Sequence, residues 1–90
     1  MAIKWRPIDT RAVSAVATAI GRVIRSHREG RRLSQESLAE LAHLNRTYLG
    51  EIERGAVIPS LETLQKLADA LGEPLWELIR QYESINKKDA

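Results

Sequence analysis

Apolar residues recur at steps of three and four along most of this chain, which is the spacing of amphipathic helices. The longest stripe begins after Asp9 or Thr10, either of which can cap a helix, and approaches Gly30. We expect Gly30 to end this helix in the left-handed conformation. The buried side of the helix comprises Val13, Val16, Ala17, Ile20, Val23, Ile24 and His27. Residues 1–9 show no period and are predicted to form an N-terminal arm.

Four shorter helices are predicted to follow, each with its own boundary signals. The start signals are Ser34, Asn45, Pro59-Ser60 and Pro74, and the stop signals are Gly55 and Gly72. The inward residues are Leu38, Ala39 and Ala42; Leu49 and Ile52; Leu61, Leu64, Leu67, Ala68 and Leu71; and Leu75, Leu78, Ile79 and Tyr82. No window alternates with the period of two that marks a strand. The pattern predicts an all-α domain of five helices over residues 10–83, with a C-terminal tail at 84–90.

The composition fits a single domain with an aliphatic core. The chain has 90 residues, of which 43% are hydrophobic and only 4% aromatic, so Leu, Ile, Val and Ala must build the interior. The absence of cysteine excludes disulfides and thiolate metal sites, and we expect no metal and no cofactor. No membrane span or signal peptide is visible, which predicts a cytoplasmic protein. The net charge of only +2 permits a nucleic-acid partner but does not demand one.

The segment from Gln35 to Arg54, QESLAELAHLNRTYLGEIER, fits a helix-turn-helix unit. Two helices that cross at a steep angle need a small residue where their backbones approach, and Ala39 supplies it. The turn usually requires a residue that tolerates a positive φ, and His43 occupies that place. The inner positions of both helices are apolar: Leu38, Ala42, Leu44, Leu49 and Ile52.

The stretch from Leu33 to Leu78 combines LSQ before the second helix, RTY opening the third, IERG ending it and PSLETL opening the fourth. In this order and spacing it resembles the Cro/CI-type (Xre-like) helix-turn-helix family, which includes phage repressors, restriction-modification controller proteins and antitoxins. The resemblance implies a five-helix, lambda-repressor-like DNA-binding domain, and LNRTYLGEIERG is similar to single-domain controller proteins. His43 stands where the family usually has glycine. Leu41 stands where a polar residue is common, as an extra core contact or as an exposed apolar residue.

This resemblance implies that the chain binds double-stranded DNA as a transcriptional regulator, with the helix at about 45–54 in the major groove. A protein with this activity is expected to be associated with the nucleoid. Arg46 can donate to guanine O6 and N7, and Thr47 can touch a thymine methyl group or a phosphate. Glu51 either accepts a hydrogen bond from cytosine or holds an arginine in place. The predicted base-edge residues are Arg46, Thr47, Gly50 and Glu51, where Gly50 permits close approach. The predicted phosphate contacts are Gln35, Asn45, Tyr48, Arg54 and Arg32.

Two further charged features have structural alternatives. Glu53, within IERG, is predicted to make an internal ion pair or hydrogen bond rather than a DNA contact. The densest basic run is either the solvated end of a helix or an extension of the phosphate-binding rim, and comprises Arg25, Arg28, Arg31 and Arg32.

Trp76 adds apolar surface to a fifth helix that already has a complete inward stripe. Since one domain offers one recognition helix, a two-fold homodimer is an economical way to gain affinity for an operator. We therefore predict a homodimer through Trp76, Ile79 and Tyr82. The short chain leaves no room for a ligand-sensing domain, so no small-molecule ligand is expected.

Two other classes of function compete with DNA binding. An enzyme is disfavoured, because the carboxylates come with no nucleophile, phosphate loop or metal set, and His27 and His43 lie sixteen positions apart. The stronger alternative is a protein-interaction module, such as an antitoxin or a partner-binding helix-turn-helix domain with weak DNA binding. Steep salt dependence of DNA binding would separate the two.

Overall fold

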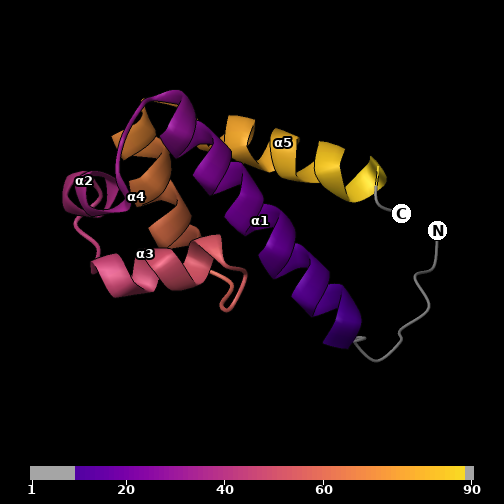
Figure 1. Cartoon of the computed structure of the whole chain (residues 1–90). Helices are drawn as coiled ribbons and strands as arrows, with labels where there is room; N and C mark the ends of the chain where they lie inside the picture. The colour runs from indigo at the N-terminus through magenta and orange to yellow at the C-terminus, as the bar shows by residue number, and fades with distance from the viewer. Residues whose placement is uncertain (1–9, 89–90) are drawn as a thin grey trace.

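The computed structural model describes residues 10–88, which form five α-helices and no strand. In chain order these are α1 (Thr10–Gly30), α2 (Gln35–Leu41), α3 (Arg46–Glu53), α4 (Leu61–Leu71) and α5 (Leu75–Lys88). The long helix α1 crosses the molecule, with α2, α3 and α4 gathered on one side and α5 running beside it (Figure 1). The predicted all-α, five-helix architecture is confirmed.

Local side-chain hydrogen bonds explain where α2, α3 and α4 begin. The Ser34 hydroxyl accepts from the backbone N–H of Ser37, and the Ser60 hydroxyl accepts in the same way from Thr63. The Asn45 carboxamide oxygen accepts from the N–H groups of Thr47 and Tyr48. Each bond satisfies helix donors that have no partner within the helix. The three predicted N-caps are therefore confirmed.

The helices α1 to α4 all end in the same way, in a Schellman motif. A residue with positive φ donates its N–H to a carbonyl three residues earlier, and the next residue donates to a carbonyl five residues earlier. The four positive-φ residues are Arg32 (57°), His43 (57°), Gly55 (75°) and Gly72 (71°). The predictions for the last three are confirmed, including the left-handed histidine in the helix-turn-helix turn.

The prediction for Gly30 is wrong, because Gly30 remains within α1 and Arg32 takes the left-handed conformation. The residue after the left-handed position normally packs against the helix it follows. With Arg32 in that position the following residue is Leu33, which packs against the core, whereas a turn at Gly30 would have placed Arg31 there. At the other end of the chain α5 reaches Lys88, so residues 84–88, predicted as a tail, are helical.

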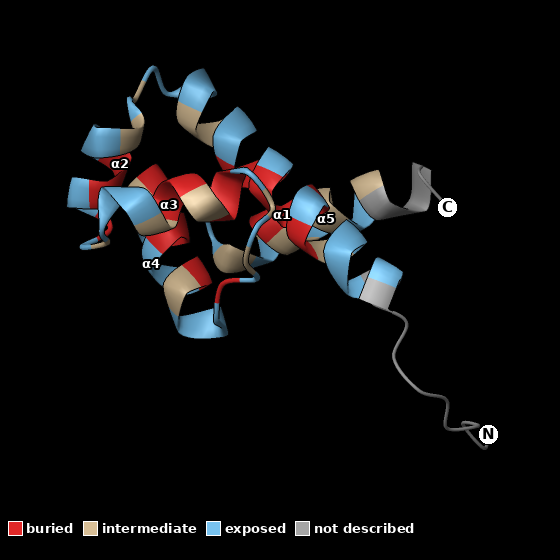
Figure 2. Ribbon diagram, turned by 60° about the horizontal axis from the view of Figure 1, so that its bottom comes forward, coloured by how far each residue is buried: buried red, intermediate tan, exposed pale blue. Residues whose placement is uncertain are grey.

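The core lies between all five helices (Figure 2). Its largest fully buried side chains are aliphatic and come from α1 to α4: Ile24, Leu38, Leu49, Ile52, Leu67 and Leu71. The most buried residue of α5 is Leu78, at 2% exposure. Two predicted inward residues, Val13 and Leu61, are exposed. Both lie in the first turns of their helices, beyond the region where neighbouring helices cover the stripe.

Gly21 allows α1 to lie directly against the C-terminal end of α3. A Cβ atom at this position would overlap the carbonyl oxygen of Ile52 and would lie 2.7 Å from that of Glu53. The turn after α3 also approaches α1, although less closely, since a Cβ at Gly55 would lie 3.0 Å from the Cα of Thr18. These two contacts fix the C-terminal end of α3 against α1.

Candidate nucleic-acid interface

The helices α2 and α3 and the turn between them form the predicted helix-turn-helix unit. Leu38, Ala39 and Ala42 of α2 are buried against the core, as are Leu49 and Ile52 of α3. Ala39 also accepts a hydrogen bond from the N–H of Leu44, which closes the turn at His43. Apolar contacts with the core thus hold the unit in place, and most of its polar residues lie on the outside.

The outer face of α3 presents part of the predicted base-reading set. Arg46 and Thr47, in the first turn, are exposed, and Glu51 is half-buried. Gly50 is buried, so the prediction that it lies on the open face is wrong. A Cβ at Gly50 would lie 3.1 Å from Nη1 of Arg54 and 3.9 Å from Oε1 of Gln35, so these side chains cover it. The accessible part of the predicted base-reading set is therefore Arg46, Thr47 and the edge of Glu51.

Asn45 and Tyr48 have structural roles in addition to any contact with DNA. The Asn45 oxygen is occupied by two backbone N–H groups, at 2.7 and 3.3 Å, which leaves its amide nitrogen as the group that can donate outward. Tyr48 is half-buried and packs against the core.

A buried ion pair joins the C-terminal end of α3 to α1. The guanidinium of Arg28 donates to both carboxylate oxygens of Glu53, at 2.7 and 3.0 Å, and to the carbonyl oxygen of Leu33 at 2.8 Å. The Glu53 and Arg28 side chains are only 3% and 12% exposed. The hydrogen bond to Glu53 is the main cause that raises the pKa of Arg28. The predicted internal role of Glu53 is confirmed.

Gln35 belongs to the same network. Its amide nitrogen donates to Oε1 of Glu53 at 3.0 Å, so the first residue of α2 is tied to the last residue of α3. The predicted phosphate contact of Gln35 is thereby restricted to the second N–H of the amide group.

The four arginines of the basic run do not form one surface. Arg28 is buried with Glu53, Arg25 pairs with Glu29 at 3.5 Å, and Arg31 pairs with Glu73 at 3.6 Å. Arg32 is exposed on the turn after α1. Because Arg28 is buried, the idea that the whole run extends the phosphate-binding rim is wrong. The exposed Arg32 keeps its own predicted phosphate contact.

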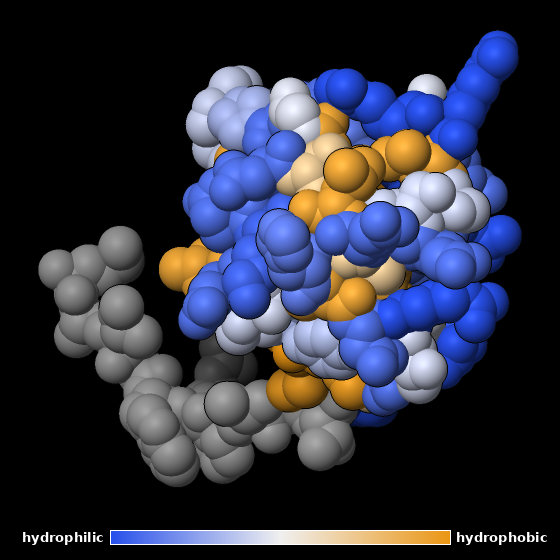
Figure 3. Space-filling model, turned by 90° about the vertical axis from the view of Figure 1, so that its left-hand side faces the viewer, coloured by the Kyte–Doolittle hydropathy of each residue, from blue (hydrophilic) through white to orange (hydrophobic). Residues whose placement is uncertain are grey.

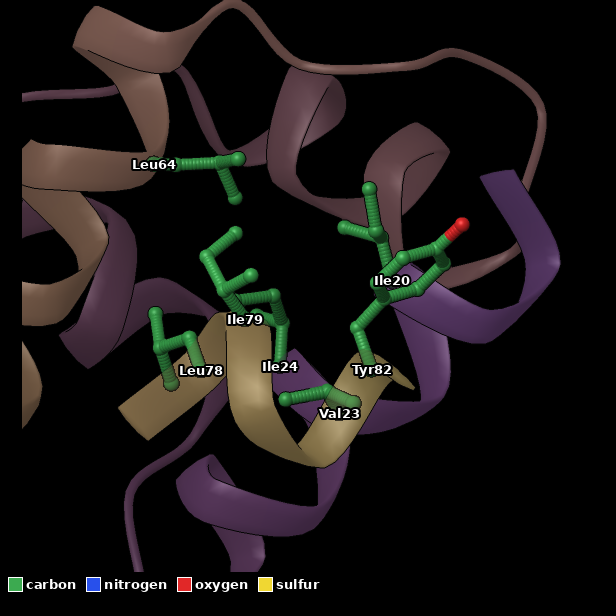
Figure 4. A pocket seen from close by; sticks show the side chains of 7 residues that line it. All are labelled: Ile20, Val23, Ile24, Leu64, Leu78, Ile79 and Tyr82. Carbon is green, nitrogen blue, oxygen red and sulfur yellow. The ribbon is translucent and has the colours of Figure 1, made fainter. Parts of the chain in front are cut away.

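The predicted dimer residues of α5 lie in different environments. Trp76 is 65% exposed, whereas Ile79 and Tyr82 are half-buried. Figure 4 shows these two directed toward Ile20, Val23 and Ile24 of α1, around a small apolar pocket. Ile79 and Tyr82 thus hold α5 to α1, and of the three predicted dimer residues Trp76 is the one left on the surface. On the same helix, hydrogen bonds from Arg80 and Gln81 lower the pKa of Glu77 to about 2.

Leu41 is an exposed apolar residue and not an extra core contact, which decides between its two sequence interpretations. It lines an open groove together with Ala42 and His43 of the turn and with Lys66, Asp69 and Ala70 of α4. The side of the molecule that carries α2 shows such apolar surface among hydrophilic residues (Figure 3).

Among residues 10–88, no helix is both long enough and apolar enough to cross a membrane. Within the same residues, no three side chains of His, Cys, Asp or Glu gather in a way that would hold a metal ion.

The sequence profile of a helix-turn-helix family matches residues 24–78, which is more than half of the chain. The chain belongs to the Cro/CI-type helix-turn-helix family. It is 45% identical over 65 residues to the control protein C.SmaI of Serratia marcescens, covering 72% of this chain and 77% of that protein. It is 39% identical over 71 residues to an immunity repressor of Bacillus phage phi105, which covers 79% of this chain. The chain spans only 49% of that repressor's length.

A solved relative has the same fold. The restriction-modification controller protein C.AhdI of Aeromonas hydrophila superposes with a TM-score of 0.67 and 42% sequence identity, over 69% of this chain and 94% of that one. The match confirms the family that the motifs LSQ, RTY, IERG and PSLETL indicated.

Two features of the structure were not predicted from the sequence: the inward-facing Arg28 and the contact of Gly21 with α3. Arg28 lies four residues after the buried Ile24, and this helical spacing indicates an inward position. The signal was hidden because Arg28 stands within a run of arginines. The contact of Gly21 with α3 leaves no local signal, because a glycine within a helix has no distinctive pattern until the neighbouring helix is placed.

Proposed function

We propose that this chain is a sequence-specific, double-stranded DNA-binding transcriptional regulator that reads the major groove with α3 and binds a two-fold operator as a homodimer. The observation that carries the proposal is the first turn of α3, where Arg46 and Thr47 are exposed on a helix supported by the buried Arg28–Glu53 pair. The protein acts as a binding protein and not as an enzyme, in the cytoplasm, and without a small-molecule ligand.

The exposed side chains have distinct roles in this proposal. Arg46 donates to guanine O6 and N7, and Thr47 contacts a thymine methyl group or a phosphate. Backbone phosphates are bound by Arg32, Arg54, the Tyr48 hydroxyl and the amide nitrogens of Asn45 and Gln35. These contacts position the helix but do not read the sequence. Half-buried Glu51 either accepts from cytosine N4 or orients a neighbouring arginine.

Selection of bound duplexes from a random DNA pool at moderate salt tests the function directly. We expect an inverted repeat whose half-site centres lie about one helical turn, roughly 10 bp, apart. Binding of the selected duplex should weaken steeply as salt rises, because phosphate contacts release counterions. A folded protein that enriches no sequence would instead favour the protein-interaction alternative. The exposed Leu41 and its groove support that alternative, and are the surface to test next.

Replacing Arg46 by alanine is expected to weaken binding to the selected operator by about 1–3 kcal/mol, because one bidentate base contact is lost. Competition with operators altered at one base pair at a time measures this. The loss should depend on the base at a single position in each half-site. The matched control is Arg32→Ala, which should weaken binding to all duplexes equally, as a phosphate contact does. A uniform loss for Arg46→Ala would reassign Arg46 to the phosphate backbone.

Replacing Trp76 by aspartate is expected to convert the dimer into a monomer, since it places a charge on the exposed apolar surface of α5. Sedimentation velocity of the folded variant measures the mass. Ile79 and Tyr82 are unsuitable for this test, because they pack against α1 within the monomer. Leu41→Asp is the matched control, as Leu41 is 55% exposed on α2 and should leave the mass unchanged. An unchanged dimer mass for Trp76→Asp would place the interface elsewhere.

A further inference from the structure

Gly50 lies in the middle of α3, where glycine is unfavourable because it loses more conformational freedom than alanine when a helix forms. At Gly21 and Gly55 the close approach of another segment's backbone explains the glycine. At Gly50 it does not. Apart from the helix's own backbone and the adjacent residues of the chain, the atoms within 4 Å of a Cβ there are the ends of two flexible side chains, Arg54 and Gln35. The packing of the fold therefore does not require a glycine at this position.

Close approach of DNA to Gly50 does not explain it either, because Gly50 is buried within the protein itself. The space above its backbone is occupied by Nη1 of Arg54, 3.1 Å from the position a Cβ would take. Arg54 is four residues later, at the C-cap of α3, and its side chain runs back toward the N-terminus of the helix over Gly50. Residues four apart lie on the same face of a helix, so this is the direction in which the two positions meet.

Gln35 also borders the space above Gly50, and it is bonded to the buried Arg28–Glu53 pair. Gln35 Oε1 lies 3.9 Å from the same Cβ position, and the Gln35 amide nitrogen is held by Glu53 at 3.0 Å. Glu53 is in turn held by Arg28. The Arg54 guanidinium thus lies across α3, beside a glutamine whose amide group has a fixed orientation.

We propose that Gly50 is a positioning residue: the side chain it lacks leaves the place in which the Arg54 guanidinium is held across α3, next to Gln35, ready to bind a DNA backbone phosphate. A long side chain that is already ordered loses less rotamer freedom when it binds. This inference rests on the proposed DNA-binding function, and it changes the role of Gly50 from close approach of DNA to orientation of Arg54.

A double-mutant cycle tests the coupling. Gly50→Ala, Arg54→Ala and the double variant are titrated with the selected operator and with an unrelated duplex at several salt concentrations. We expect Arg54→Ala to weaken binding about tenfold on both duplexes and to reduce the salt slope by about one, as loss of one charged phosphate contact does. Gly50→Ala should weaken binding about threefold or more in the same sequence-independent way, because the guanidinium must shift away from Gln35 to make room for the methyl group. The double variant should bind no more weakly than Arg54→Ala.

Gly30→Ala is the matched control, since Gly30 is also helical and a Cβ there meets nothing within 4 Å; it should bind as the wild type does. Thermal unfolding of Gly50→Ala should give an unchanged or higher Tm. Additive losses in the double variant, or no loss in Gly50→Ala, would overturn the inference and leave the function intact. A lower Tm would make Gly50 a structural glycine instead. A wild-type protein that selects no duplex would overturn the proposed function and this inference with it.

Discussion

Replacing Gly21 by alanine is expected to lower the free energy of unfolding by about 3 kcal/mol, the upper end of the usual range for overpacking. The added Cβ would overlap the carbonyl oxygen of Ile52 and lie 2.7 Å from that of Glu53. Both are backbone atoms at the end of α3, so no side-chain rotation can relieve the contact. The helices α1 and α3 must move apart, and the buried residues between them lose contacts. For a domain of this size the change corresponds to a fall in Tm of roughly 12–24 °C.

Thermal and urea unfolding of the variant measure this loss. Gly30→Ala, in the same helix with open space around its Cβ position, should keep or raise the stability of the protein. The same separation of α1 from α3 should disturb the Arg28–Glu53 pair, because Glu53 carries one of the two carbonyls involved. If Gly21→Ala were as stable as Gly30→Ala, the close crossing of α1 and α3 would not exist in solution.

The sequence predicted helix starts better than helix ends, and the reason is physical. An N-cap such as Ser34 or Asn45 acts through a hydrogen bond to a residue two or three positions away, so its effect is visible in the local sequence. The end of α1 depends instead on which apolar residue reaches the core after the turn. Leu33 does so, and Arg32 therefore takes a conformation that Gly30 would adopt more easily.

The candidate site shows the same division. The exposure of Arg46 and Thr47 follows from the helical period of α3 alone, and the structure agrees. The burial of Gly50 could not be predicted in this way, because it depends on where the ends of Arg54 and Gln35 lie. Arg28 was grouped with its charged neighbours in sequence, whereas its partner Glu53 is twenty-five residues away. Contacts between helices decide these roles, and a one-dimensional pattern does not contain them.

Replacing Glu53 by alanine is expected to destabilise the fold by about 3–5 kcal/mol, because it leaves the Arg28 guanidinium buried without its counter-charge. It also removes the acceptor of the Gln35 amide, so that the start of α2 and the end of α3 are no longer tied together. Urea unfolding measures the loss. Glu29→Ala is the matched control, because its pair with Arg25 is exposed and joins residues four apart on one helix. That variant should lose no more than about 0.5 kcal/mol.

A second variant separates the ion pair from simple packing. Replacing Arg28 by methionine and Glu53 by leucine together removes both charges but keeps most of the apolar volume. We expect the double variant to recover most of the stability lost in Glu53→Ala, since a buried pair contributes little net stability compared with apolar residues of similar size. It should nevertheless bind DNA more weakly than the wild type, because Gln35 loses the acceptor that orients it. Wild-type affinity in this double variant would show that the network stabilises the fold without orienting the DNA-binding surface.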